Sequence, residues 1–183
     1  LDVGQEAHLD ALHALALLAT QPASPARTEQ ETALRYALSS PLSIARGWGG
    51  PEARSALARA YELAYALDSG THLAATLLAL SFTYAGQGEI QKALAVGEEL
   101  LQLAHQVEDP LFRAAAHQSV GLAFVLRGEF RTAREHLEEA LRLYDTQPAA
   151  SFDLLMGLDE KVTCLTWLAW AIWPLGYADQ GAK

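Results

Sequence analysis

Cysteine is almost absent from this 183-residue chain, which contains Cys164 and no other. A single cysteine cannot form an internal disulfide, so the sequence agrees with a reducing, cytoplasmic compartment. Cys164 lies in an apolar run, where a cysteine is usually a small buried hydrophobe. A catalytic thiol would need a neighbouring base, and no histidine follows it in the chain. We therefore expect no nucleophilic role for this residue.

Basic residues are also scarce, because 13 lysines and arginines stand against 22 aspartates and glutamates, for a formal net charge of −9. Proteins that bind nucleic acids cluster basic residues to neutralise phosphates, and here these residues are scattered. The sequence therefore predicts no nucleic-acid partner. It also lacks the Gly-x4-Gly-Lys-Ser/Thr loop, which excludes nucleotide binding in that mode.

Arrangements of chemistry-bearing residues are missing as well. No two of the six histidines have the i, i+4 spacing of a helical zinc site, so no metal and no cofactor are predicted. The acidic clusters, such as Glu98-Glu99 and Glu138-Glu139, have basic residues nearby and are typical of a solvated helix face. We therefore expect a protein that is not an enzyme.

The chain has no apolar run long enough for a membrane span. The most apolar stretch, Cys164 to Leu175, is about half the required length and contains Pro174, so no membrane association is predicted. Residues 1–6 lack the basic start and apolar run of a signal peptide. The chain begins without Met, and its last residues resemble the start of a helix. We therefore expect a fragment of a longer protein.

Alternation of apolar and polar residues, the mark of a half-buried strand, is not found, whereas helix breakers recur regularly. The predicted fold class is therefore all-α, in about four helical hairpins. We expect one helical-repeat domain over residues 1–183, with helix pairs at 3–46, 51–86, 89–126 and 129–175 and a partial helix at 178–183.

An internal repeat is centred on glycines in predicted turns. Gly88 and Gly128 are 40 residues apart (128 − 88), and Gly176 follows 48 residues later (176 − 128). The extra eight residues are expected between 146 and 158. Four residues before each glycine stand Tyr84, Phe124 and Ile172, which we expect to be structurally equivalent.

The residues around these glycines share one order of large and small side chains. The three first helices read Leu77-x2-Leu80-Ser81-x2-Tyr84, His117-x2-Val120-Gly121-x2-Phe124 and Leu165-x2-Leu168-Ala169-x2-Ile172, and Ala93 and Ala133 follow in the second helices. This order resembles the tetratricopeptide repeat, whose first helix has the signature W-x2-L-G-x2-Y. The resemblance implies a right-handed α-α superhelix, or solenoid, in which small residues let paired helices approach closely.

Longer stretches resemble one subfamily of these repeats. Residues 17–22, 34–52, 128–145 and 164–180 are similar to the long-period repeats of large bacterial signalling proteins. These are adenylate/guanylate cyclases and serine/threonine kinases fused to a predicted ATPase, and related ATP-dependent transcriptional activators. The resemblance implies a regulatory segment of such a multidomain protein, without its catalytic parts.

Three tryptophans, Trp167, Trp170 and Trp173, recur every three residues on one predicted helix. Leu165, Leu168 and Ile172 supply the stripe toward the partner helix, and Trp170 lies about 200° from Leu168 on the helical wheel. In the tetratricopeptide family the equivalent positions line the concave groove. The resemblance therefore implies an apolar groove formed by Phe82, Leu122, Val125, Trp170 and Trp173.

Two readings of these rings stay open. They anchor a hydrophobic peptide, a helix or a small ligand, or a following repeat covers them. Gln118 and Thr166 stand where some family members carry a lysine that clamps a terminal carboxylate, so no such clamp is predicted.

The leading functional hypothesis is a non-catalytic protein-interaction module of a bacterial signalling protein. The alternative is a sensor that binds a small effector in the groove. The expected partner is a protein, a peptide or another domain of the same chain, and a homodimer through exposed solenoid ends is possible in this architecture.

Overall fold

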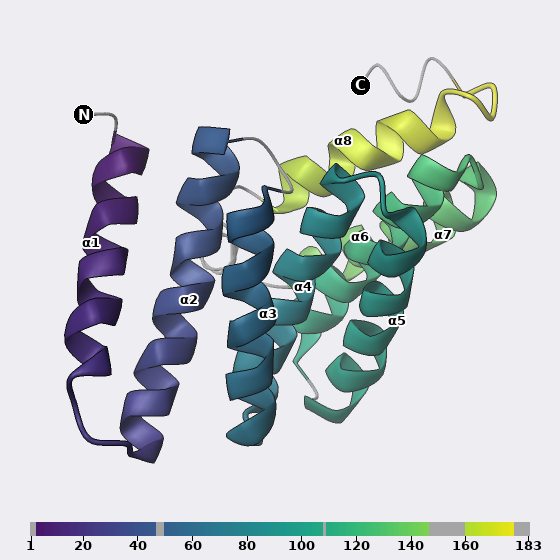
Figure 1. The fold of residues 1–183 in the computed structure, drawn as a ribbon. Helices are drawn as coiled ribbons and strands as arrows, with labels where there is room; N and C mark the ends of the chain where they lie inside the picture. Colours follow the sequence, from purple (N-terminus) through teal and green to yellow (C-terminus); the bar gives the residue numbers. More distant parts are fainter. Residues whose placement is uncertain (1–2, 47–49, 108, 147–159, 178–183) are drawn as a thin grey trace.

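The chain folds as a row of α-helices (Figure 1). A computed structural model describes residues 3–46, 50–107, 109–146 and 160–177. These residues form the eight helices α1 Val3–Ala19, α2 Pro25–Arg46, α3 Pro51–Ala66, α4 Gly70–Gly86, α5 Ile90–Val107, α6 Pro110–Arg127, α7 Phe130–Tyr144 and α8 Glu160–Ile172. No strand occurs among them, so the all-α prediction is confirmed. The partial helix predicted at 178–183 lies outside the described residues.

The packing order is that of a solenoid. Each helix contacts the next one along the chain, and the even-numbered helices α2, α4, α6 and α8 also contact one another in succession. The even-numbered helices therefore form one layer and the odd-numbered helices the other. Such stacking buries the apolar face that one helix pair cannot bury alone. The chain is a tetratricopeptide-like helical solenoid.

The repeat glycines occupy identical turns. Gly88, Gly128 and Gly176 have φ of 75°, 78° and 89°, which is the left-handed region that a glycine enters without steric cost. In each turn the glycine N–H bonds to the carbonyl three residues back, and the next N–H bonds to the carbonyl five residues back. These paired bonds satisfy the last carbonyls of a helix. The predicted equivalence of Tyr84, Phe124 and Ile172 is therefore confirmed, because their carbonyls accept the longer bond in each turn.

A fourth copy of this turn joins α3 to α4 without a glycine. Asp68 has φ of 52°, its N–H bonds to the Tyr65 carbonyl at 3.2 Å, and the Ser69 N–H bonds to the Ala64 carbonyl at 3.2 Å. Aspartate is tolerated in the left-handed region, although glycine is the usual residue there.

Small residues set the distance between paired helices. A Cβ built on Gly121 of α6 would lie 2.6 Å from Cγ of Leu137 in α7, so only glycine fits there. Ala93 of α5 and Ala133 of α7 are fully buried at equivalent places. The close approach that the sequence pattern predicted is confirmed at these positions.

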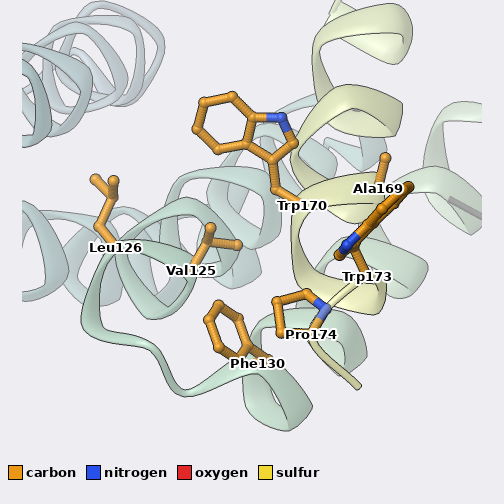
Figure 2. Close-up of a pocket in the computed structure, with 7 residues that line it drawn as sticks. All are labelled: Val125, Leu126, Phe130, Ala169, Trp170, Trp173 and Pro174. Atoms are coloured by element: carbon orange, nitrogen blue, oxygen red, sulfur yellow. The ribbon is translucent and has the colours of Figure 1, made fainter. Parts of the chain in front are cut away.

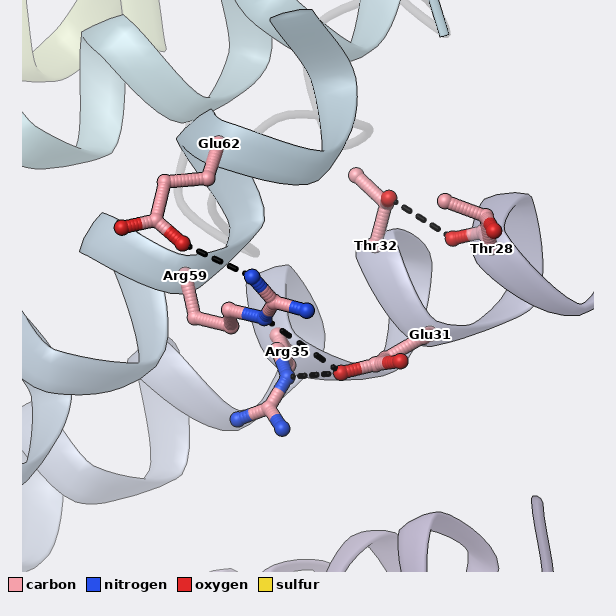
Figure 3. A network of polar contacts seen from close by, with 6 residues as sticks. All are labelled: Thr28, Glu31, Thr32, Arg35, Arg59 and Glu62. Carbon is pink, nitrogen blue, oxygen red and sulfur yellow. Dashed lines mark hydrogen bonds and ion pairs between the residues drawn. The ribbon is translucent and has the colours of Figure 1, made fainter. Parts of the chain in front are cut away.

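Surface ion pairs join α2 to α3 on a different part of the stack (Figure 3). The Arg35 Nε lies 2.8 Å from the Glu31 carboxylate, and Arg59 lies between Glu31 (3.8 Å) and Glu62 (2.8 Å). Such partly exposed pairs contribute little to stability individually, about 0–1 kcal/mol each. We assign this cluster a structural role.

A buried polar chain fixes the start of α8. The Tyr144 hydroxyl of α7 donates to Gln118 Oε1 of α6 at 2.7 Å, and Gln118 Nε2 donates to Glu160 Oε2 at 3.1 Å. All three residues are at most 2% exposed. Buried polar groups must be paired in this way to be tolerated. These linked hydrogen bonds between Tyr144, Gln118 and Glu160 therefore hold the start of α8 against α6 and α7.

Candidate functional site

The candidate site lies where α4, α6 and α8 follow one another in the even-numbered layer. Phe82, Leu122 and Trp170 each stand six residues before a turn glycine, so they occupy equivalent positions on these three helices. Phe82 and Leu122 are 8% and 4% exposed, whereas Trp170 is 55% exposed. The structure therefore brings these predicted residues together, but only Trp170 presents a large area to solvent.

A first hollow, which we call the inner hollow, opens between these helices. Its volume is about 380 Å³. It is lined by Phe82, Ala85, Gly86, Leu122, Leu126, Thr163, Trp167 and Trp170. Its walls are almost wholly apolar, as in pockets that bind small molecules or anchor side chains.

A second hollow, which we call the outer hollow, lies beyond Trp170 toward the end of α8 (Figure 2). Its volume is about 710 Å³. It is lined by Val125, Leu126, Phe130, Ala169, Trp170, Trp173 and Pro174. Trp170 and Leu126 line both hollows. The five residues predicted for one groove are thus divided between two adjoining hollows, with Trp170 at the ridge between them.

The ridge is held by ring packing. The Trp167 and Trp170 rings meet edge to face, with centroids 5.0 Å apart and planes at 89°. This is a favourable geometry for an aromatic pair. Trp167 is half-buried and packs against the cores on both sides of α6, so it fixes the exposed ring of Trp170. The Trp167 indole nitrogen is buried and has no hydrogen-bond partner among the described residues.

Arg127 and Arg134 form ion pairs but line neither hollow. Arg127 pairs with Glu129 at 2.6 Å, and Arg134 pairs with Glu138 at 2.6 Å and lies over the Tyr177 ring. The hydrogen bond that Arg134 donates to the Glu138 carboxylate raises the pKa of its guanidinium.

Cys164 and Tyr144 line neither hollow. Cys164 is fully buried, and this burial raises the pKa of its thiol to about 12, which keeps it protonated and inert. Burial also raises the pKa of Tyr144. No group of three or more histidine, cysteine or acidic side chains among the described residues is arranged to hold a metal ion.

The predicted groove lacked eight of the residues that line the hollows, which are Ala85, Gly86, Leu126, Phe130, Thr163, Trp167, Ala169 and Pro174. Leu126 lies in the last turn of α6 and Phe130 is the first residue of α7, and the stripe predicted on the first helices included neither position. Trp167 was noted, but not as a lining residue. The expected stripe on α8 also differs, because Leu165 is 47% exposed whereas Cys164 and Ala171 are fully buried.

Part of the chain matches a known protein family. Residues 73–146 match the family of the tetratricopeptide repeat. The matched segment covers α4 to α7 almost completely, including the turns at Gly88 and Gly128. No curated protein matches the chain.

Tetratricopeptide repeats generally mediate protein–protein interaction and are typically not catalytic. No described helix of this chain has the length and apolarity that a membrane crossing requires.

Proposed function

We propose that this chain is a non-catalytic protein-interaction module that binds an apolar segment of another protein across Trp170. The observation that carries the proposal is the position of Trp170, a 55% exposed ring between two adjoining apolar hollows. Tryptophan is among the residues most enriched at interface hot spots, because its ring buries a large apolar area on binding. The supporting ring of Trp167 holds Trp170 in place before binding, which lowers the entropic cost of association.

The dimensions of the site favour a helical or extended peptide. The two hollows adjoin along the α8 side of the layer, and each accepts one or two large apolar side chains. A helix presents such side chains at i and i+3 or i+4, one turn apart. The partner is therefore a protein, a peptide, or another domain of the same polypeptide. The net charge of −9 argues against a nucleic acid.

The wider context is proposed from resemblance alone. The similarity of residues 128–145 and 164–180 to repeats of bacterial signalling ATPases supports a regulatory segment in a cytoplasmic multidomain protein. In such a protein the module transmits a binding event to catalytic domains elsewhere in the chain.

A second candidate function is supported by the inner hollow. Its volume of about 380 Å³ lies within the range of small-molecule pockets, roughly 300–1,000 Å³. The buried Trp167 N–H beside it lacks an acceptor among the described residues. A small apolar effector with one acceptor group would satisfy this donor after a modest movement of the ring.

The experiment selects helical peptides from a display library on the 183-residue chain and compares Trp170→Ala with a matched control, Tyr65→Ala. Tyr65 is 71% exposed on α3, far from the hollows along the row. We expect Trp170→Ala to weaken the selected peptides by about tenfold to a hundredfold, and Tyr65→Ala to leave them unchanged. Equal binding by both variants contradicts the proposal.

A thermal-shift screen of metabolites distinguishes the small-molecule sensor from the protein-interaction module. A stabilising metabolite whose effect is lost in Phe82→Trp, which fills the inner hollow, favours the sensor. Stabilisation by peptides and by no metabolite favours the interaction module.

A further inference from the structure

Two histidines on different helices face each other in the α6–α7 pair. The Nδ1 atom of His117 in α6 lies 3.1 Å from the Nδ1 atom of His136 in α7. The ring centroids are 5.2 Å apart and the ring planes are tilted by 39°. Both side chains are partly exposed, and neither lines the inner or the outer hollow. The pair is therefore separate from the residues proposed to bind the protein partner.

The close packing of the two helices produces this contact. Gly121 stands one turn after His117, and Leu137, which directly follows His136, packs against it. Because glycine lets α6 and α7 approach closely, side chains of the neighbouring turn also meet. The sequence-based expectation of no metal site considered histidines spaced i, i+4 on one helix, and this spacing does not cover a pair from two helices.

The His136 ring is held in one orientation by its neighbours on α6. It lies against both His117 and Phe124, which are seven residues (124 − 117), or about two helical turns, apart. The Phe124 and His136 rings are stacked, with centroids 5.7 Å apart and planes at 30°. Such packing restricts rotation of the imidazole, so the two Nδ1 atoms are positioned before a ligand arrives.

The distance between the two Nδ1 atoms fits a shared metal ion. Tetrahedral Zn²⁺ binds histidine nitrogen at about 2.0–2.1 Å, which places two nitrogen ligands about 3.3 Å apart. The 3.1 Å between the Nδ1 atoms of His117 and His136 is close to this separation, so only a small movement of either ring is required. Imidazole nitrogen is also a preferred ligand of Zn²⁺.

Both imidazoles are mainly neutral at neutral pH, as a metal ligand must be. Burial and the neighbouring His136 ring lower the pKa of His117 to about 4, and burial lowers the pKa of His136. Without metal, one ring donates its Nδ1 proton to the Nδ1 atom of the other. When metal binds, the donor ring takes the tautomer that carries the proton on Nε2. Both Nδ1 lone pairs then bind the ion, and the pair loses no proton overall.

The charges that act on His136 favour a cation. They come from Glu135 of the same helix and Glu98 of α5, and both carboxylates are exposed. A negative potential beside the rings raises the local concentration of metal cations. We therefore expect these carboxylates to strengthen metal binding.

The charges that act on His117 are mixed. The Glu139 carboxylate favours a cation, whereas Arg113 and the His105 side chain oppose it. Arg142 donates two hydrogen bonds to Glu139, at 2.8 and 2.6 Å. No third histidine, cysteine or acidic side chain in the described part of the chain completes a cluster of three ligands. The affinity for metal therefore depends on the two imidazoles.

We propose that His117 and His136 bind one Zn²⁺ ion through their Nδ1 atoms and that this ion links α6 to α7. Water completes the coordination, since both side chains are partly exposed. With two protein ligands in place of the usual four, we expect a Kd of about 1–100 µM. This proposal goes beyond the function above and does not depend on it, because neither histidine lines a hollow.

Isothermal titration of the untagged 183-residue chain with Zn²⁺ tests the proposal. We expect one site per chain, with the affinity lowered about tenfold or more in His117→Gln and in His136→Gln. His13→Gln is the matched control, because His13 is exposed on α1, and it should bind as the wild type does. Circular dichroism checks that each variant is folded. Zn²⁺ should raise the melting temperature of the wild type and of His13→Gln, but not that of the other two variants.

NMR spectroscopy of the wild type with ¹⁵N-labelled histidine identifies the ligand atoms, and it decides the question even where a variant fails to fold. We expect one equivalent of Zn²⁺ to shift the Nδ1 resonances of both His117 and His136. A Kd above about 1 mM, or equal affinity in the wild type and both ligand variants, overturns the proposal. Equal affinity for Mg²⁺, which prefers oxygen ligands, would indicate an ion held by carboxylates and also overturns it.

Discussion

Gly121 of α6 lies against Leu137 of α7 so closely that a methyl group at Gly121 would come within 2.6 Å of Cγ and 2.9 Å of Cδ2 of the leucine. Leu137 is fully buried, so it has no room to move aside. This contact therefore limits how far apart α6 and α7 must lie and leaves no space for a side chain at position 121.

We expect Gly121→Ala to lower the free energy of unfolding by about 1–3 kcal/mol, because the forced repacking outweighs the gain in helix propensity. Urea denaturation followed by circular dichroism measures the change. Gly97→Ala is the comparison, because a Cβ built on Gly97 would lie 3.0 Å from its nearest neighbours, Ser119 Oγ and Val120 Cγ2, and so would be less crowded than one on Gly121. Its loss should be smaller, and an equal loss in both variants would show that α6 and α7 separate more easily than the structure indicates.

Substitutions at the two turn residues Asp68 and Gly128 are expected to change stability in opposite directions. Asp68 adopts φ of 52°, so we expect Asp68→Gly to stabilise the protein by a few tenths to about 1 kcal/mol. Gly128→Ala should destabilise it by about 1 kcal/mol, because φ is 78° while the space around the added Cβ is open. Thermal unfolding of both variants checks the pair, and a destabilised Asp68→Gly would show that the aspartate side chain contributes more than the turn geometry costs.

Much of the fold could be predicted because its determinants are local. Gly88, Gly128 and Gly176 stand at matched places, and their turns fix where each helix ends. The small residues around Gly121 indicated close helix pairing for the same reason. The equivalent turn at Asp68 could not be found by aligning glycines, because an aspartate adopts the left-handed conformation there.

The candidate site could be predicted only in part. Phe82, Leu122 and Trp170 were found through their common distance from the turn glycines. Their different exposure depends on which helix follows in the stack, and this is a property of tertiary packing. The hollows also involve Leu126, which lines both, and Phe130, which lines the outer one, and the predicted stripe included neither residue.

The buried hydrogen bonds of Tyr144, Gln118 and Glu160 predict that loss of one hydroxyl group lowers the stability of the protein markedly. Tyr144→Phe removes the hydroxyl that donates to Gln118 Oε1 at 2.7 Å and leaves that oxygen buried without this donor. We expect a loss of about 1–3 kcal/mol in the free energy of unfolding, since an unpaired buried polar group retains its desolvation cost. Tyr65→Phe, at an exposed position, is the control. Proteolysis within α8 should also become faster in Tyr144→Phe. An unchanged rate would mean that the buried hydrogen bonds of Tyr144, Gln118 and Glu160 do not hold α8 in place.

A histidine pair between α6 and α7 predicts how stability depends on pH. The Nδ1 atoms of His117 and His136 lie 3.1 Å apart, so the two rings share one hydrogen bond. Burial and the neighbouring His136 ring lower the pKa of His117 to about 4, although Glu139 opposes this shift; Arg113 and His105 lower it further. Burial also lowers the pKa of His136, against the charges of Glu135 and Glu98.

The sign of the effect follows from these shifts. The pKa of an unfolded histidine is about 6.5, so between that value and about 4 the unfolded chain binds more protons than the folded one. The contribution of the pair to stability is therefore complete above pH 6.5 and is lost as the pH falls toward 4. Because both rings are half-exposed, we expect a loss of order 1 kcal/mol between pH 7 and pH 5. His117→Gln should flatten this dependence in urea titrations at the two pH values, whereas His13→Gln on exposed α1 should not. An equal slope in wild type and His117→Gln would place the acid sensitivity elsewhere in the chain.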